Sequence, residues 1–191
     1  LLEKYDDVTY VPIDISEGAV HLLLAELESE YPLLKVKGLV TDYFAGLRWL
    51  ADSDMSRNVV LFLGSNIGNF TPKERTMFLK SLHASMNTGD YLFTGFDMVK
   101  DIDILERAYN DAEGITARFN MNILERINRE LEGNFDTGLF SYKSHWYPGE
   151  GAIKSYLVSR IKQEVHIGAL SMTYTFEAGE AVHTESSYKF T

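Results

Sequence analysis

Residues 58–74 read NVVLFLGSNIGNFTPKE, and this stretch decides the fold. It opens with a short β-branched and aromatic run, residues 59–63, which is typical of a strand buried on both faces. A glycine-rich segment follows, residues 64–70. Thr71 and Glu74 then have the spacing of a capping box, and Pro72 suits the first turn, so we expect a helix to begin there. The glycine-rich segment is therefore predicted to be a strand-to-helix loop.

A loop of this kind is a candidate ligand site. In open α/β sheets such loops lie at the carboxyl ends of the strands, where ligands bind. Gly64 and Gly68 lack the Cβ atoms that would hold a ligand away from the backbone. Asn69, at the end of the loop, can present its side-chain amide.

Strands and helices alternate through the first half of the chain. The helices have periodic apolar positions and recognisable caps, such as Ser16 at a start and Pro32 after an end. We expect strands over residues 10–14, 34–40, 59–63 and 91–96, and helices over residues 17–31 and 43–50 and from residue 71 onward. Strands separated by helices predict a parallel, doubly wound sheet.

The pattern changes after about residue 100. Two helices are predicted, over residues 102–110 and 115–131, with a break near Gly114. The second carries apolar residues at every fourth position: Phe119, Ile123, Ile127 and Leu131. Beyond Asn134 the apolar period becomes two, which predicts antiparallel strands around residues 140–146, 153–160 and 170–176.

Composition narrows the class of protein. With 191 residues and 45% apolar content the chain can bury a sizeable core. A net charge of −10 argues against nucleic acid as a partner, and no apolar run has the length needed to span a bilayer. The lack of cysteine excludes a thiolate nucleophile. We therefore expect a cytoplasmic protein that contacts neither nucleic acid nor membrane.

The first residues, Leu1–Tyr5, resemble the tail of a helix.

Acidic residues end two of the predicted strands. Asp14 is placed to accept hydrogen bonds from ribose hydroxyls in a nucleotide-type fold. Asp42 could bind an exocyclic amine while Tyr43 packs against a base. Each aspartate could instead cap the helix that follows it, and spacing alone favours that simpler interpretation. Their occurrence on one edge with the Gly64 loop is what supports a ligand site.

Four segments stand in order along the chain: YVPIDIS (residues 10–16), LGSNIGNF (63–70), AYNDAEGITARFN (108–120) and TESSYKF (184–190). Through these segments the chain resembles the S-adenosylmethionine-dependent, histidine-specific Nα-methyltransferases of ergothioneine biosynthesis. The third is long enough to be specific. The resemblance is to the family rather than to one substrate.

The resemblance implies an α/β fold: a Rossmann-like methyltransferase core with an antiparallel β substrate-recognition subdomain. Residues 1–100 would form part of the core, and residues 101–191 would continue the same domain as the substrate-binding region. The family's first strand and its glycine-rich loop would lie upstream of Tyr10 and are absent from this chain. The implied cofactor is S-adenosylmethionine, with its ribose on Asp14, its adenine on Asp42 and Tyr43, and Gly64 in the cofactor-binding loop.

The resemblance also implies where a small amino-acid substrate would bind. Asn69 and Tyr109 would hold its carboxylate, with Thr116 nearby, and Glu185 and Ser187 would hold the imidazole. Simpler roles exist for three of these residues. Asn69 could satisfy the backbone of its loop, Tyr109 could be a helix residue packed on the sheet, and Glu185 could be a solvated charge. Thr116 in particular stays open between a substrate contact and a polar residue at a helix N-terminus.

The implied chemistry is in-line displacement, in which a neutral amine attacks the methyl carbon of a sulfonium. It needs alignment and desolvation but no metal and no covalent nucleophile. No residue can be assigned as the base. Ser155 stands where the family usually has methionine in the imidazole pocket, which changes the size and polarity of that pocket. The alternatives are therefore a methyltransferase for another amino acid or small amine, or a cofactor-binding module without turnover.

Overall fold

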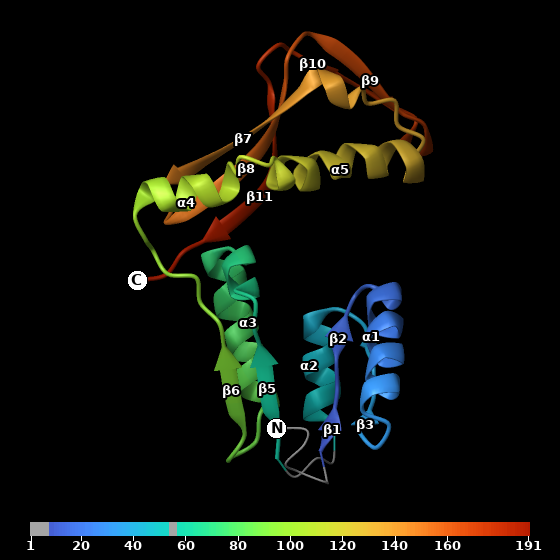
Figure 1. The fold of residues 1–191 in the computed structure, drawn as a ribbon, viewed down its shortest axis with the longest axis vertical. Coiled ribbons are helices and arrows are strands. Elements are labelled where there is room, and N and C mark those ends of the chain that lie inside the picture. The colour runs from blue at the N-terminus through green and yellow to red at the C-terminus, as the bar shows by residue number, and fades with distance from the viewer. Residues whose placement is uncertain (1–7, 54–56) are drawn as a thin grey trace. The chain divides into compact units, whose positions relative to one another are not determined.

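The computed structural model describes residues 8–53 and 57–191 (Figure 1). Contacts divide these residues into two compact units, the first comprising those up to residue 60 together with 74–92, and the second comprising 61–73 and 93–191. The helix tail expected at Leu1–Tyr5 lies outside the described residues. Within the described ranges, no helix is both long and apolar enough to cross a membrane.

Short parallel strand pairs form the first unit. β1 (Thr9–Tyr10) pairs with β3 (Lys35–Val36), and β2 (Ile13–Asp14) pairs with β4 (Leu39–Val40). The parallel pairing predicted here is confirmed for these strands, whereas one doubly wound sheet that joins all the strands stays a prediction, because the pairs form separate two-stranded sheets. The two continuous strands expected over residues 10–14 and 34–40 are each interrupted.

Both interruptions have a local cause. Pro12 has no N–H to donate, so the pairing lapses on its own strand, although its carbonyl still accepts from the N–H of Leu39 at 2.9 Å. On the partner strand, Gly38 lies so close to α1 (Glu17–Glu30) that an added Cβ would come within 2.5 Å of Val20 Cγ1. The break at Gly38 therefore coincides with close packing of strand on helix.

Side-chain caps fix the helices of this unit. Ser16 Oγ accepts from the N–H of Ala19 at 3.2 Å at the start of α1, and Asp42 Oδ1 accepts from the N–H of Ala45 at 2.8 Å at the start of α2 (Tyr43–Ala51). α3 (Pro72–Ser85) begins at the predicted proline. All three predicted helices are confirmed.

β5 (Val59–Phe62) pairs with β6 (Tyr91–Thr94). The prediction that β5 is buried on both faces is wrong. Phe62 is buried, but Val59 and Leu61 are 47% and 48% exposed. Val59 and Leu61 point to one face of the strand and Val60 and Phe62 to the other, so one face of β5 is covered and the other is largely exposed.

The second unit is an antiparallel sheet with helices on one face (Figure 1). β7 (Phe140–Tyr147), β8 (Ala152–Ser159) and β11 (Ala181–Tyr188) pair in the order β11-β8-β7. β9 (Gln163–Ile167) and β10 (Met172–Phe176) form a separate antiparallel pair. α4 (Ile102–Tyr109) and α5 (Ile115–Glu130) pack on the larger sheet. Three short 3-10 helices complete the unit: η1 (Asn66–Asn69), η2 (Thr137–Leu139) and η3 (Gly168–Leu170).

The core of this unit lies between α5 and the strands. Its buried members come from one helix and four strands: Leu124, Phe140, Leu157, Val165 and Phe176. The apolar positions at fourfold spacing do not form the buried face of α5, because Phe119 is 73% exposed. Asn120 and Leu124 are the buried residues instead. The sheet, rather than the hydrophobicity of the helix, thus selects the buried face.

Candidate functional site

The two acidic strand ends of the first unit lie beside each other. Asp14 pairs with Val40 across β2 and β4, and the N–H of Thr41 donates to the Asp14 carbonyl at 2.9 Å. Asp42 follows directly. Parallel strands end at the same edge of a sheet, so this pairing places both carboxylates at one edge.

Both carboxylates also serve local structure. Asp14 Oδ1 accepts from the N–H of Ser16 at 2.8 Å, and Asp42 Oδ1 caps α2. Burial, and then the negative charge of Asp14, raise the pKa of Tyr43 above its ordinary value. Tyr43 and Asp14 are therefore electrostatic neighbours. The capping interpretation is confirmed for Asp42, and each aspartate keeps its second carboxylate oxygen for another partner.

The glycine-rich loop belongs to the second unit. Gly64 has φ of 70° and Ser65 has φ of 60°, so the chain leaves β5 through two left-handed residues. η1 then packs against β11. A Cβ on Gly68 would lie 2.8 Å from the carbonyl oxygen of Tyr188, so this glycine permits the close approach. Asn69 ends η1 beside β11 and is exposed.

Tyr109, Ser187 and Lys189 form a hydrogen-bonded cluster in the second unit. Tyr109 Oη donates to Ser187 Oγ at 2.8 Å. Lys189 Nζ donates to both hydroxyl oxygens, at 2.8 Å to Tyr109 and 2.7 Å to Ser187, and lies 4.8 Å from the centroid of the Tyr109 ring. The last turn of α4 and the end of β11 are thereby joined by side chains that are far apart in sequence.

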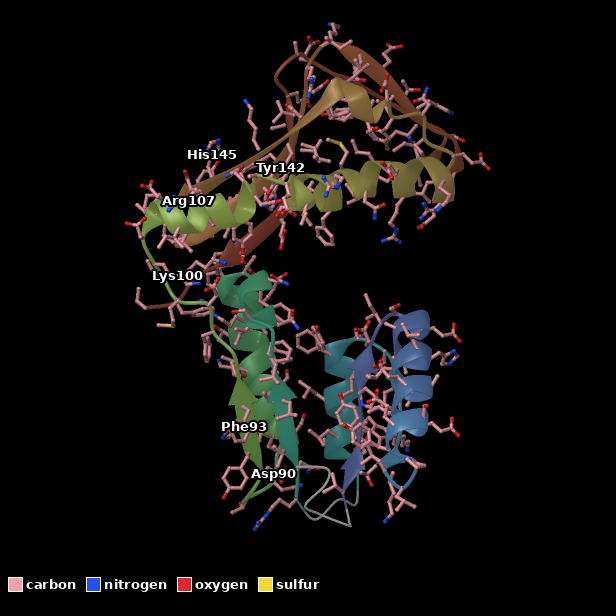
Figure 2. The ribbon with its side chains drawn as sticks, viewed as in Figure 1. Asp90, Phe93, Lys100, Arg107, Tyr142 and His145 are labelled. Atoms are coloured by element: carbon pink, nitrogen blue, oxygen red, sulfur yellow. The ribbon has the colours of Figure 1, made fainter. Side chains whose placement is uncertain are left out.

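Asp97 balances the charge of this cluster. Its Oδ2 lies 3.1 Å from Lys189 Nζ, and its Oδ1 lies 2.7 Å from Nζ of Lys100, which is on the segment leading into α4 (Figure 2). Burial would raise the pKa of Asp97, but hydrogen bonds from Lys100 and Lys189 lower it below the ordinary value. Backbone bonds between Phe190 and residues 97 and 99 fix the aspartate in place.

Glu185 belongs to a row of side chains that crosses the sheet. It lies opposite Ser155 on β8, and Ser155 lies opposite Ser144 on β7. Ser155 Oγ is 2.9 Å from the hydroxyl of Tyr142, which lies on β7 near the start of α5 (Figure 2). Among the described residues, Ser144 Oγ is buried without a hydrogen-bond partner, and the half-buried Glu185 carboxylate has neither a hydrogen bond nor an ion pair.

Thr116 lies at the start of α5, where Asp111 binds it. Its backbone N–H donates to Asp111 Oδ1 at 2.9 Å, and that of Ile115 donates to Oδ2 at 2.6 Å. Hydrogen bonds from the side chain and the backbone of Thr116 are the main reasons that the pKa of Asp111 falls to about 2. This geometry favours the helix N-terminal role for Thr116.

Sequence reasoning missed Lys189. It lies within the TESSYKF segment, but no role was expected for it. The available signal was the strand period of two, which places residues 185, 187 and 189 on one side of an extended chain. Asn120 was also missed: its Oδ1 accepts from Thr184 Oγ1 at 2.6 Å, which ties α5 to β11.

The predicted substrate residues thus gather around β11 within one unit, apart from Thr116, which is engaged by Asp111. They offer an amide, two hydroxyls and a carboxylate, which suit a small zwitterion with a polar side chain. Among the described residues, no group of three or more histidine, cysteine or acidic side chains is suited to a metal ion. The predicted cofactor residues Asp14, Asp42 and Tyr43 share one edge of the first unit, and Gly64 lies in the second.

Comparison with known proteins identifies the family. The model of the S-adenosylmethionine-dependent, histidine-specific methyltransferase family matches residues 1–191, and the chain belongs to this family. It is 39% identical over 181 residues to the histidine N-alpha-methyltransferase of Mycolicibacterium smegmatis, covering 95% of this chain and 56% of that protein. The chain thus spans just over half the length of that relative.

Two fungal proteins are also similar. Ergothioneine biosynthesis protein 1 of Schizosaccharomyces pombe is 31% identical over 193 residues, covering 98% of this chain and 25% of that protein. The L-tryptophan methyltransferase of Psilocybe serbica is 29% identical over 146 residues, covering 71% of this chain and 40% of that protein.

Proposed function

We propose that the full-length protein transfers a methyl group from S-adenosylmethionine to the α-amine of L-histidine. The observation that carries the proposal is the convergence on β11 of Asn69 from η1, Tyr109 from α4, and Glu185 and Ser187 from the strand itself. Family membership and the names of the bacterial and Schizosaccharomyces pombe relatives support the same reaction.

The residues present suit the cofactor. Two carboxylates at the end of one parallel strand pair can accept hydrogen bonds from ribose hydroxyls and an exocyclic amine, and each has an oxygen beyond the one that serves the backbone. Tyr43 can pack against an adenine ring. We assign Asp14, Asp42, Tyr43 and Gly64 to cofactor binding, the parallel pairs and their helices to a Rossmann-like core within residues 1–100, and residues 101–191 to substrate recognition.

When bound, S-adenosylmethionine supplies an electrophilic methyl carbon on its sulfonium. The residues of the chain then have to hold the amine in line with that carbon and keep it neutral. Asn69 and Tyr109 anchor the carboxylate, which fixes the neighbouring amine. Glu185 and Ser187 fix the far end of the side chain. Two anchors on one rigid strand and its neighbours restrict rotation of the substrate, which is the main contribution that alignment can make.

The direct test is methyl transfer by the full-length protein. Purified protein is incubated with methyl-labelled S-adenosylmethionine and each of the proteinogenic amino acids, and mass spectrometry identifies the methylated product. We expect histidine to be methylated at its α-nitrogen at least about tenfold faster than any other amino acid. Methylation of the ring nitrogen, or no turnover of histidine alongside turnover of another amino acid, would refute the proposal.

A second candidate substrate is an amino acid with a larger aromatic side chain. The observation that favours this substrate is the position of Ser155, which lies opposite Glu185, where the family usually has methionine. Serine is smaller than methionine and leaves room for a larger ring. The Psilocybe serbica relative is named as a tryptophan methyltransferase. The same assay decides between the two substrates. If Ser155 makes room for an indole, the protein should methylate tryptophan faster than histidine.

A further inference from the structure

We propose that Lys189 determines side-chain specificity by holding Ser187 as a hydrogen-bond donor toward the substrate. The inference rests on the proposed function and concerns the same site. It assigns Lys189 as a positioning residue, because its effect on the substrate passes through Ser187.

The ammonium of Lys189 is fully committed to protein partners. Its side chain is 1% exposed, and Nζ lies 2.8 Å from Tyr109 Oη, 2.7 Å from Ser187 Oγ and 3.1 Å from Asp97 Oδ2. An ammonium has three N–H donors and no acceptor. Each of the three donors therefore has one oxygen, and none is left for a substrate. A buried charge with this set of partners has a fixed position and a fixed polarity.

This arrangement fixes the polarity of Ser187. A serine hydroxyl has one O–H donor and two acceptor lone pairs. Ser187 Oγ accepts from Lys189 at 2.7 Å and from Tyr109 at 2.8 Å, which uses both lone pairs. Its remaining capacity is then to donate. Because Lys189 has no acceptor, it keeps the Ser187 proton turned away from the ammonium even when Tyr109 donates elsewhere, so Lys189 favours a substrate acceptor opposite Ser187.

Glu185 imposes the opposite requirement two residues earlier on the same face of β11. Its ionised carboxylate only accepts, and it has no partner among the described residues. Together Glu185 and Ser187 select a side chain with one donor and one acceptor. A neutral imidazole has both, an indole has the donor alone, and a hydrocarbon or thiophene ring has no nitrogen for either role. Lys189 thereby favours neutral imidazole.

The lysine also separates carboxylate capture from side-chain recognition. When Tyr109 turns its proton toward a substrate carboxylate, Ser187 loses the tyrosine as a donor but keeps the ammonium. Loss of Tyr109 should therefore weaken the binding of all amino acids alike. Loss of Lys189 should weaken the binding only of those whose ring offers a hydrogen-bond acceptor to Ser187.

The experiment is calorimetric titration of the full-length protein, saturated with S-adenosylhomocysteine, with two probes of similar ring size. The probes are L-histidine and β-(2-thienyl)-L-alanine, and the readout is the ratio of their Kd values. We expect Lys189→Met to reduce the preference for histidine by about tenfold, the size expected for loss of one well-placed hydrogen bond. Lys189→Gln keeps an N–H donor and should retain most of the preference. Lys162→Met is the matched control, because Lys162 is exposed and pairs with Glu177 at a distance of 2.6 Å.

The outcomes separate this inference from the proposed function. Equal binding of the two probes by the wild-type protein would overturn both. A wild-type preference for histidine that persists in Lys189→Met would overturn the inference alone, as would an equal loss in Lys189→Gln. Thermal unfolding shows whether each variant is folded. If Lys189→Met does not fold, Tyr109→Phe provides the test: it should weaken both probes and leave their ratio within about threefold, and collapse of the ratio would overturn the inference.

Discussion

Gly68→Ala should weaken amino-acid binding through the position of η1. The added Cβ would lie 2.8 Å from the carbonyl oxygen of Tyr188, whereas ordinary contact begins at 3.4 Å. Because that neighbour is backbone, η1 or β11 has to shift by about 0.6 Å, the difference between these two distances. Overpacking of this kind typically costs about 1–3 kcal/mol of stability.

The same shift would move Asn69, the next residue, away from the carboxylate that we assign to it. The shift should weaken the hydrogen bond from Asn69 to that carboxylate, and because loss of one hydrogen bond to a charged group costs about 1.5–3 kcal/mol, we expect a loss of roughly tenfold in affinity for histidine. Calorimetry with S-adenosylhomocysteine present measures this affinity, and thermal unfolding measures stability. Cofactor affinity should change by less than about threefold, because the residues that we assign to the ribose and adenine, Asp14, Asp42 and Tyr43, are on other elements and Gly64 lies before η1.

Gly18→Ala is the matched control. Gly18 lies in α1 with no atom within 4 Å of an added Cβ, and alanine has the higher helix propensity. This variant should be at least as stable as the wild type and bind histidine equally well. If Gly68→Ala also keeps both wild-type stability and wild-type histidine affinity, the close approach of η1 to β11 does not position Asn69, and the reasoning is refuted.

Three further substitutions test the site, a helix cap and the core. Asn69→Ala should weaken histidine binding by at least about tenfold with little effect on the cofactor, and equal loss of both by calorimetry would contradict its assignment. Asp111→Ala should lower the melting temperature at neutral pH. Because the pKa of Asp111 is depressed to about 2, the ionised carboxylate stabilises the fold above about pH 4, and this stabilisation is lost toward pH 2. If the difference in melting temperature between the wild type and Asp111→Ala stays constant over this range, the capping role is contradicted. Leu157→Ala should cost about 2–5 kcal/mol by denaturant unfolding, since the side chain is fully buried, and a cost below about 1 kcal/mol would show that the site collapses around the change.

The local elements were the most predictable part of the fold. Ser16 and Asp42 predict helix starts, because the side-chain oxygen of an N-cap residue accepts a hydrogen bond from an N–H two or three residues later. Such contacts depend on the neighbouring sequence alone. The alternation after Asn134 similarly predicts antiparallel strands. The errors occur where distant packing decides. β5 was expected to be buried on both faces from its composition, and Phe119 belongs to an apolar stripe of α5 that is not its buried face.

The candidate site divides in the same way. The family segments predicted Asn69, Tyr109, Glu185 and Ser187 as substrate residues, but they did not reveal which of their atoms meet. Lys189 had no expected role until the end of β11 was seen beside the end of α4.

The sequence by itself determined the helix caps, the strand-to-helix loop and the change from a helical to a strand period, because each depends on residues within one or two turns of each other. Only the tertiary structure decided that an ammonium near the end of the chain holds hydroxyls from α4 and β11, with Asp97 as its counter-charge. Those groups lie up to 92 residues apart, from Asp97 to Lys189. Their pairing depends on sheet register and helix packing, which no local pattern specifies.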